Sequence, residues 1–301
     1  MTRYAMPPPA LRPGARVGVA ALSGVVDREA LGRGLAGLRA LGFAPVPAAN
    51  LALEEGLFAG SDRERLDGLH RLAADPSLDA IVFARGGHGM LRLLPDLDWE
   101  LLASRPRWFV GYSDLTPFLM QVVQRLGWVA LHGPMAAVEP ARGLAADEAR
   151  SLREALGGLG PATLPLIGAA GGWDAVEGPL VGGCLSLLAA TLGTPWALRA
   201  ADCILFLEDV GEPLYRVDRM LQQLRLAGAL AEVRGIVLGK LDESGAEGAS
   251  PEDLRAAVAA AAGSEVPVAW GCPSGHCRPN LTLPLGARAR VEAGALRLVV
   301  G

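Results

Sequence analysis

Trp108-Phe-Val-Gly-Tyr-Ser-Asp-Leu-Thr116 joins an apolar strand to a tight turn and then to a helix. The apolar run predicts a buried strand that ends at Tyr112, followed by a helix from Asp114 to about Leu126. A serine at such a turn lies beside the free N–H groups of a helix N-terminus, which can stabilise an oxyanion. The segment lacks the glycine two residues after the serine that the G-x-S-x-G elbow requires. On this segment alone, a helix cap is the commoner role for Ser113.

Strands and helices alternate on both sides of this segment. The pattern predicts strands at 16–22, 43–47, 78–84 and 128–131, with helices at 27–41 and 61–74. Asp27 and Ser61 are the expected N-caps of these two helices. Such alternation indicates βαβ units and a parallel sheet with helices on both faces. Reactive groups on such a sheet gather at the carboxyl ends of its strands.

A segment rich in glycine, proline and alanine, residues 161–178, has little periodicity and predicts a domain boundary. We expect an N-terminal α/β domain at 1–165, a linker at 166–178 and a smaller C-terminal α/β domain at 179–301. In the C-terminal part, the pattern predicts helices at 185–192 and 212–227 and strands at 203–207 and 235–241. Ser250-Pro-Glu-Asp253 predicts a further helix start.

The charge balance and the cysteines argue against several classes of protein. The net charge is −4 and the pI about 5.7, whereas a nucleic-acid-binding protein normally has a basic face. The first apolar run, residues 17–22, is too short for a signal peptide or a membrane span, so we expect a soluble cytoplasmic protein. The cysteines form no CxxC pair and are expected as reduced thiols: Cys184, Cys203, Cys272 and Cys277. The last two lie close to His276, but without a second ligand cluster we expect no metal.

A glycine-rich loop, Phe83-Ala-Arg-Gly-Gly-His-Gly89, follows the strand at 78–84. Its glycines permit close backbone approach and expose N–H groups. Alone it could be an anion-binding loop or a simple turn, and it fits neither the P-loop nor the dinucleotide-binding fingerprint. His88 is either a base or, as is commoner for a histidine between glycines, a solvated surface residue.

Two later segments each place a titratable group after an apolar run: Ile204-Leu-Phe-Leu-Glu-Asp209 and Gly271-Cys-Pro-Ser-Gly-His276. A carboxylate can orient a histidine, and the histidine can then deprotonate a serine. Alternatively, Glu208 caps the following helix and His276 is an ordinary loop histidine. Asp209 takes the place of Glu208 if the strand ends one residue later.

Eight stretches, in this order along the chain, resemble the LD-carboxypeptidase family, the muramoyl-tetrapeptide carboxypeptidases. They are Arg85-Gly-Gly-His-Gly89, Gly111-Tyr-Ser-Asp114, His132-Gly-Pro-Met135, Gly178-Pro-Leu-Val-Gly-Gly183, Gly193-Thr-Pro195, Leu207-Glu-Asp209, Tyr215-Arg-Val-Asp-Arg-Met220 and Gly275-His276. One such motif would carry little weight, but eight in sequence are specific, and they extend over most of the chain.

The resemblance implies a catalytic triad of Ser113, Glu208 and His276, with an oxyanion hole formed by the N–H groups of Asp114 and Gly87. It implies an N-terminal parallel-sheet domain, flavodoxin-like or amidotransferase-like, joined to a smaller C-terminal α/β domain, usually in a homodimer. The reaction implied is cofactor-free hydrolysis of an L,D-peptide bond, which releases D-alanine from a murein tetrapeptide in cell-wall recycling. A site shared by both domains is expected in the cleft between them.

A carboxypeptidase must also recognise a terminal carboxylate, for which a guanidinium is the natural partner. The candidate substrate-binding residues are Gly86 of the glycine loop and three arginines, each of which could equally be a structural ion-pair residue: Arg85, Arg216 and Arg278. The chain departs from the family pattern at Cys184, where asparagine is common, and at His88, where tyrosine is frequent. Both departures bear on substrate choice, and Cys184 on a local hydrogen-bond network.

Three alternatives stay open. Some relatives hydrolyse peptide–nucleotide antibiotics of the microcin C type, and Trp173 is the one obvious aromatic candidate for an adenine pocket. A catalytically silent binding protein could share the scaffold, although the complete triad argues against it. The glycine loop could bind phosphate in a dehydrogenase or transferase, but no acidic residue follows at the ribose spacing.

Overall fold

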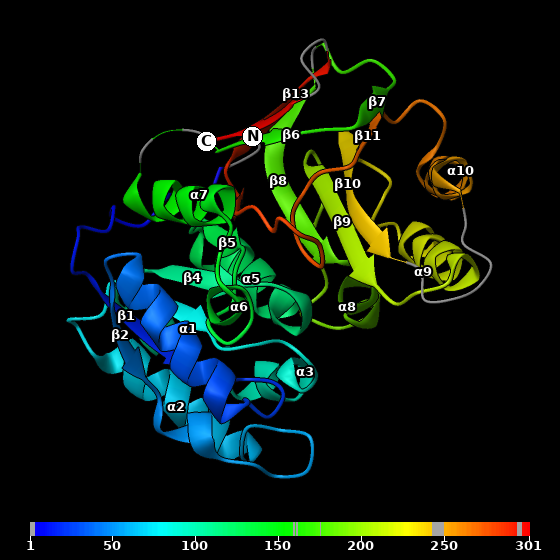
Figure 1. The fold of residues 1–301 in the computed structure, drawn as a ribbon. Helices are drawn as coiled ribbons and strands as arrows, with labels where there is room; N and C mark the ends of the chain where they lie inside the picture. Colours follow the sequence, from blue (N-terminus) through cyan, green and yellow to red (C-terminus); the bar gives the residue numbers. More distant parts are fainter. Residues whose placement is uncertain (1–3, 159, 161, 175, 243–249, 294–296) are drawn as a thin grey trace.

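The computed structural model describes residues 4–158, 160, 162–174, 176–242, 250–293 and 297–301, which form two sheets with flanking helices (Figure 1). The first sheet has the strand order β12-β5-β4-β3-β1-β2. Its strands are β1 (Arg16–Ala20), β2 (Ala44–Pro47), β3 (Ala80–Phe83), β4 (Trp108–Gly111), β5 (Ala130–His132) and β12 (Leu283–Leu285). The second has the order β6-β14-β13-β8-β9-β10-β11-β7. Its strands are β6 (Ala162–Pro165), β7 (Gly168–Ala170), β8 (Glu177–Cys184), β9 (Ile204–Val210), β10 (Gly235–Asp242), β11 (Val268–Trp270), β13 (Arg288–Glu292) and β14 (Arg297–Val300).

The helices fall into a group around the first sheet and a group beside the second (Figure 1). The first group is α1 (Arg28–Ala40), α2 (Asp62–Ala74), α3 (Met90–Leu93), α4 (Trp99–Ala103), α5 (Thr116–Gln121), α6 (Glu139–Arg142) and α7 (Ala146–Gly157). The second is α8 (Leu185–Ala190), α9 (Leu214–Leu226) and α10 (Pro251–Ala262). Within the described residues, no helix has the length and apolar character needed to cross a membrane.

Five neighbouring strands of the first sheet, β2, β1, β3, β4 and β5, run parallel. Helices cover the sheet, so β3, β4 and β5 are buried along their whole length. The expected caps are confirmed: Asp27 accepts the N–H of Ala30, and Ser61 forms a capping box with Glu64. The alternation of strands and helices therefore predicted this sheet correctly.

The second sheet has a parallel centre, β8-β9-β10-β11, with antiparallel strands added at both edges. Helices α9 and α10 pack together beside it (Figure 1). Ser250 caps α10 in a capping box with Asp253, as expected. The predicted fold class, two α/β parts of which the first is a parallel sheet, is confirmed.

Three short strands belong to a different sheet from the one that the predicted domain limits imply. β6 and β7, which lie in the segment expected to hold the end of the first domain and the linker, both belong to the second sheet. β12, from the C-terminal part, pairs antiparallel with β5 of the first sheet. Such three- or four-residue strands are too short to show a period of two. The domain limits at 165 and 178 stay a prediction, since strand pairing alone does not define them.

The helix expected from Asp114 to Leu126 is divided. A 3₁₀ turn covers Ser113–Leu115, α5 covers the next six residues, and a π-helical turn over Val122–Leu126 ends at Gly127. Pro117 lies in the first turn of α5. Because proline clashes with the carbonyl four residues earlier, an α-helix cannot extend back from Pro117 to Ser113. The turn at Ser113 is therefore free to take another conformation.

Candidate active site

Ser113 has a left-handed backbone. Its φ is +62°, a value that only one other non-glycine residue, Asp202, shares in the described part of the chain. Such a conformation costs of order 1–3 kcal/mol and is concentrated at functional sites. No side-chain hydrogen bond caps the 3₁₀ turn or α5, so the capping interpretation of Ser113 is wrong. The side chain is half-buried at the carboxyl end of β4.

The glycine loop lies directly against this turn, because β3 and β4 are parallel neighbours and end at the same edge. A Cβ added to Gly86 would lie 2.9 Å from Ser113 Cβ and 3.0 Å from Ser113 Oγ. The carbonyl of Gly86 accepts the N–H of Gly24 at 3.2 Å, and Gly87 has a φ of +117°. The close approach expected of these glycines is present, and a side chain at position 86 would displace Ser113.

Asp114 has its carboxylate in a structural role. One oxygen accepts the hydroxyl of Ser23 at 2.6 Å and the N–H of Met90 at 2.9 Å. These bonds tie the turn after β4 to the residues just beyond the glycine loop. The backbone N–H of Asp114 lies in the first turn of this segment, where such groups have no acceptor within the helix.

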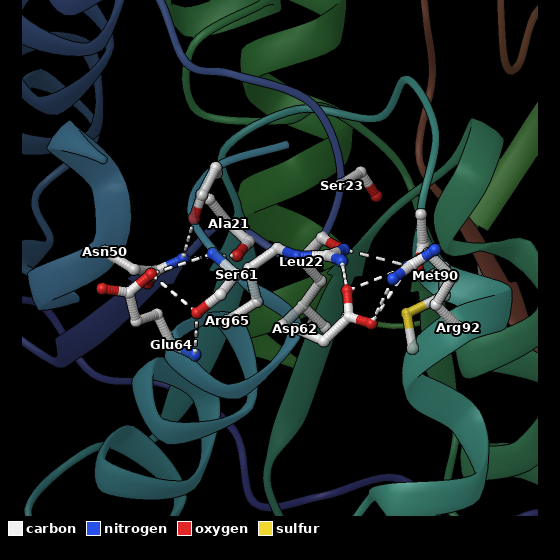
Figure 2. A network of polar contacts seen from close by, with 12 residues as sticks. Ala21, Leu22, Ser23, Asn50, Ser61, Asp62, Glu64, Arg65, Met90 and Arg92 are labelled. Atoms are coloured by element: carbon white, nitrogen blue, oxygen red, sulfur yellow. Dashed lines mark hydrogen bonds and ion pairs between the residues drawn. The ribbon is translucent and has the colours of Figure 1, made fainter. Parts of the chain in front are cut away.

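A buried arginine supports the far end of the glycine loop (Figure 2). Arg65 is fully buried, donates to the carbonyls of Leu22 and Gly89, and pairs with Asp62. Asp62 also pairs with Arg92, with Nη2 and Oδ2 2.7 Å apart, and this hydrogen bond chiefly lowers the pKa of Asp62. Sequence analysis missed Arg65, although it shares the buried stripe of α2 with Leu69 and Leu72.

Glu208 and His276 form a hydrogen-bonded pair. Glu208 is fully buried in β9, and its Oε2 lies 2.7 Å from His276 Nδ1 and 3.0 Å from the backbone nitrogen of His276. A carboxylate only accepts, so Nδ1 carries the proton and Nε2 is left as an acceptor. Glu208 is therefore not a helix cap, and His276 is not an unpartnered loop residue.

Asp209 points away from this pair. Successive side chains of a strand alternate between the two faces of the sheet, and Asp209 accepts the N–H of Ser186 at 2.7 Å. Cys184 lies on the same side, with its sulfur 3.4 Å from both Asp209 Oδ1 and Ser186 Oγ. The alternative in which Asp209 replaces Glu208 is wrong, and Cys184 belongs to the Asp209 network rather than to that of His276.

The charge around His276 favours its protonated form. Burial is the largest single influence and acts to lower the pKa of His276. The hydrogen bond and charge of Glu208, with the charges of Asp209 and Glu139, outweigh burial, so that the pKa is raised above 6.5. The imidazole meets the Tyr112 ring edge-on, with centroids 5.0 Å apart. Tyr112 precedes Ser113, so His276 lies beside the turn that carries the serine.

Buried polar groups near the first sheet fix the loop that carries His276. Asn280 accepts the N–H of Gly275 at 2.8 Å and donates to Glu139 at 3.1 Å. The backbone N–H of Asn280 donates to Glu148 at 2.8 Å. Glu139 also accepts the hydroxyl of Tyr112 at 2.9 Å. Sequence analysis missed these three side chains, because the partners are far apart in the chain.

The three candidate arginines differ in their surroundings. Arg216 of α9 forms an ion pair at 3.1 Å with Glu212, which precedes the helix. Arg85 is exposed and donates one N–H to the carbonyl of Val25 at 2.7 Å, which leaves the rest of its guanidinium open. Arg278 is exposed and forms no ion pair within the described ranges. Of the three, only Arg216 has a carboxylate partner among the described residues.

The remaining candidates from the sequence have other roles. Trp173 is buried against Gly235 of β10, so its ring is not available to an adenine. His88 is exposed beside the Phe58 ring. Burial raises the pKa of the Cys277 thiol to about 12, and that of Cys272 further still. Across the residues that the structure describes, no group of three or more His, Cys, Asp or Glu has metal-binding geometry.

Both halves of the chain match models of a known protein family. Residues 17–133 match the family model for the LD-carboxypeptidase N-terminal domain, and residues 177–291 match that for the LD-carboxypeptidase C-terminal domain. The chain belongs to the LD-carboxypeptidase family. The murein tetrapeptide carboxypeptidase of Pseudomonas aeruginosa is 36% identical over 250 residues, which cover 79% of this chain and 80% of that protein. A Bacillus subtilis relative, named "probable murein peptide carboxypeptidase", is 33% identical and covers 97% of this chain and 93% of its own length.

Solved structures of LD-carboxypeptidase relatives share the fold. The muramoyltetrapeptide carboxypeptidase of Oxalobacter formigenes is 32% identical, with a TM-score of 0.83 over 95% of this chain and 98% of that one. The microcin C7 self-immunity protein MccF is 25% identical, with a TM-score of 0.88 over 99% of this chain and 98% of that one. The family makes the protein a peptidase, and its two-sheet architecture is that of these neighbours.

Proposed function

We propose that this LD-carboxypeptidase is of the serine type and releases the terminal D-alanine from a murein tetrapeptide. The observation that carries the proposal is the 2.7 Å hydrogen bond between Glu208 and His276. It leaves an imidazole nitrogen free beside a turn on which Ser113 has a left-handed backbone. The murein carboxypeptidases among the relatives supply the substrate class.

In the first half of the reaction, His276 Nε2 takes the proton of Ser113 Oγ, which attacks the carbonyl carbon of the L,D-peptide bond. The tetrahedral intermediate collapses when His276 gives its proton to the leaving amine, and D-alanine departs. In the second half, His276 deprotonates water, which attacks the acyl-enzyme. The tripeptide leaves and Ser113 regains its proton. Glu208 stabilises the imidazolium formed in each half.

The backbone N–H groups of Asp114 and Gly87 are the proposed oxyanion hole. They lie on the turns that follow β4 and β3, and Gly86 brings the two turns into contact. Each such donor typically contributes about 3 kcal/mol to transition-state stabilisation. Arg85 and Arg278 are the proposed partners of the terminal carboxylate, because their guanidinium groups stay open to a ligand.

The test is to incubate the purified protein with muropeptide tetrapeptide and to follow tripeptide and free D-alanine by mass spectrometry. Ser113→Ala is expected to abolish release, whereas Ser104→Ala, a change on the exposed end of α4, leaves the rate unchanged. Full activity of Ser113→Ala would refute the nucleophile. The proposed chemistry uses no metal, so EDTA is expected to leave the rate unchanged.

A second candidate function keeps the chemistry and changes the substrate. The match to MccF extends over almost the whole chain, and MccF has been solved with aspartyl sulfamoyl adenosine bound. Turnover of an aminoacyl-nucleotide with no release from the tetrapeptide would favour this candidate. The buried position of Trp173 removes the aromatic feature that the sequence offered for it. Binding of either substrate without turnover would instead indicate a silent binding protein.

The proposal includes a cytoplasmic location and a homodimer, as the family resemblance implies. Light scattering of the purified protein tests the dimer, and fractionation of cells tests the location.

A further inference from the structure

His132 is a buried histidine at the carboxyl end of β5 that the proposed mechanism does not use. Its side chain is fully buried, and its ring packs between Tyr112 and Phe206, with centroids 5.6 and 5.3 Å away. Neither ring nitrogen has a hydrogen-bond partner in the described part of the chain. Buried polar groups are nearly always satisfied, so an imidazole with two unpaired nitrogens calls for a functional explanation.

The second oxygen of Glu208 is in the same situation. Glu208 Oε2 bonds to His276, whereas Oε1 is buried without a partner among the described residues. The Nε2 atom of His132, which is itself fully buried, lies 4.0 Å from Oε1. His132 Nε2, which can donate a hydrogen bond, and Glu208 Oε1, which can only accept one, are thus two neighbouring buried atoms without partners.

The protonation state of His132 suits a neutral donor. Burial is the main cause that lowers the pKa of His132 to about 4; the charge of Glu208 acts in the opposite direction, and His276 lowers it further. Near neutral pH the ring therefore carries one N–H. The tautomer with the proton on Nε2 directs this N–H at Glu208, while the other tautomer places two lone pairs opposite each other.

We propose that His132 is a positioning residue for Glu208, whose Oε1 it holds through Nε2–H so that Oε2 stays on His276 Nδ1. This inference rests on the proposed serine mechanism. This role requires the 4.0 Å separation to shorten to hydrogen-bond length, and catalytic hydrogen bonds in free enzymes are often long until substrate binds. Both oxygens of the carboxylate would then be fixed, one by each histidine.

The packing around His132 keeps the donor in place. β5 lies between β4 and β12, and His132 pairs with Gly111 on one side and Leu283 on the other. The charges of Asp209, on the opposite face of β9, and of Glu139 on α6 act on His276, and Tyr112 after β4 interacts with Glu208. The thiols of Cys184 and Cys277 also interact with Glu208, and Lys240 on β10 acts on Cys277. None of the described groups forms a hydrogen bond with Glu208 Oε1, and His132 presents an unpartnered ring nitrogen 4.0 Å from it.

The test compares His132→Gln with His132→Asn. The glutamine amide nitrogen reaches the position of Nε2, whereas asparagine carries the same amide but reaches only the position of Nδ1. We expect His132→Gln to keep most of the native kcat. In His132→Asn, kcat is expected to fall on the order of 10–100-fold, the loss typical when a group that orients a functional ligand is removed. KM for the tetrapeptide is expected to change little in both variants.

The pH profile separates positioning from simple packing. Without a donor on Oε1, the charge of Glu208 acts on His276 alone and raises its pKa. The acidic side, or acid limb, of the kcat/KM–pH profile is therefore expected to move to higher pH in His132→Asn and to stay in place in His132→Gln. His70→Gln, a change on α2 away from the pair, is the control and should leave kcat and the limb unchanged. Equal kcat and equal limbs in Gln and Asn would overturn the proposal.

Ser113→Ala keeps the two hypotheses apart. If Ser113→Ala retains activity, the serine mechanism fails, whatever the His132 variants do. If Ser113→Ala is inactive while His132→Asn matches the native enzyme in kcat and pH limb, only the role of His132 is overturned. If Asn and Gln lose activity equally and both lower Tm, His132 is a packing residue and the proposal is again wrong.

Discussion

A single oxygen of Glu208 holds both the ring and the backbone of His276: Oε2 accepts Nδ1–H at 2.7 Å and the main-chain N–H at 3.0 Å. The ring orientation and the position of the loop are therefore set by one acceptor. Glu208→Gln keeps the size of the side chain but removes its charge. We expect kcat to fall about 10²–10⁴-fold, the range that positioned acid–base catalysis contributes. Steady-state kinetics on the tetrapeptide measures the effect, with Glu29→Gln on the exposed face of α1 as control.

The pH dependence of the native enzyme follows from the same pair. His276 must be neutral to accept a proton, and its pKa is raised above 6.5 because Glu208, Asp209 and Glu139 outweigh the opposing effect of burial. As the pH falls through this raised pKa, kcat/KM should fall with it. In Glu208→Gln the favourable charge is lost, so the limb should move to lower pH. A limb at the same pH in both enzymes would show that another group titrates.

Gly275 cannot accommodate a side chain without displacing Glu208. Its φ is +97°, and a Cβ would lie 2.3 Å from Glu208 Oε2. Gly263 has a similar φ of +95° but open space around it, which makes it a matched control. Gly263→Ala should lose about 1–2 kcal/mol of unfolding free energy from the left-handed backbone alone. Gly275→Ala should lose about 1–3 kcal/mol more from overpacking, together with most of its activity.

Urea denaturation and kcat for the two alanine variants measure these losses. Equal losses of stability would mean that the loop moves aside and that the Gly275 contact does not constrain Glu208.

Gly86→Ala tests the contact between the glycine loop and the serine. The added Cβ would lie 3.0 Å from Ser113 Oγ, while φ at Gly86 is not in the left-handed region. We expect a fall in kcat with little change in Tm, because the exposed turn can shift. Gly32→Ala in α1 has open space around the new methyl group and should gain up to about 1 kcal/mol of stability with native activity. Native kcat in Gly86→Ala would place the reacting serine elsewhere.

The carboxyl of Asp114 is predicted to act through its acceptor oxygen rather than its charge. Asp114→Ala leaves the hydroxyl of Ser23 and the N–H of Met90 unpaired, at a cost of about 1–3 kcal/mol. Asp114→Asn keeps an oxygen in the same place and should retain most of the stability and kcat. Thermal unfolding and kinetics of the two variants decide the matter, and equal damage in both would show that the charge is required.

Local signals in the sequence were sufficient for the parallel strands and for helices α1 and α2, but not for α3, α4, α6 and α7 or for the division of the helix after Ser113. Caps depend on residues three positions apart, so Asp27, Ser61 and Ser250 could be identified without knowing the fold. Strands β1, β3 and β4 were visible as apolar runs. Edge strands β6 and β7 were not, because they contain four and three residues and lie in a segment rich in glycine and proline.

The same distinction between local and distant contacts applies to the residues of the candidate site. The geometry of Glu208 and His276 agrees with the pairing that the family resemblance implies. The side chains that support the site were missed, because their partners are distant in sequence: Asn280 bonds to residues 132 and 141 positions away. No pattern within a window of the sequence carries such a contact. Arg65 is the exception, since the spacing of the buried stripe of α2 could have placed it inside.

The loop that holds His276 is anchored at one end in β11 of the second sheet and at the other in β12, which completes the edge of the first. Proteins are synthesised from the N-terminus, and their early parts begin to fold first. On the ribosome, Ser113 and Glu208 therefore emerge well before His276, and β5 has no neighbour at its outer edge until residues 283–285 follow. We expect a nascent chain to be unable to cleave peptides. Hydrolysis should begin only when the loop from β11 to β12, which carries His276, has packed against both sheets.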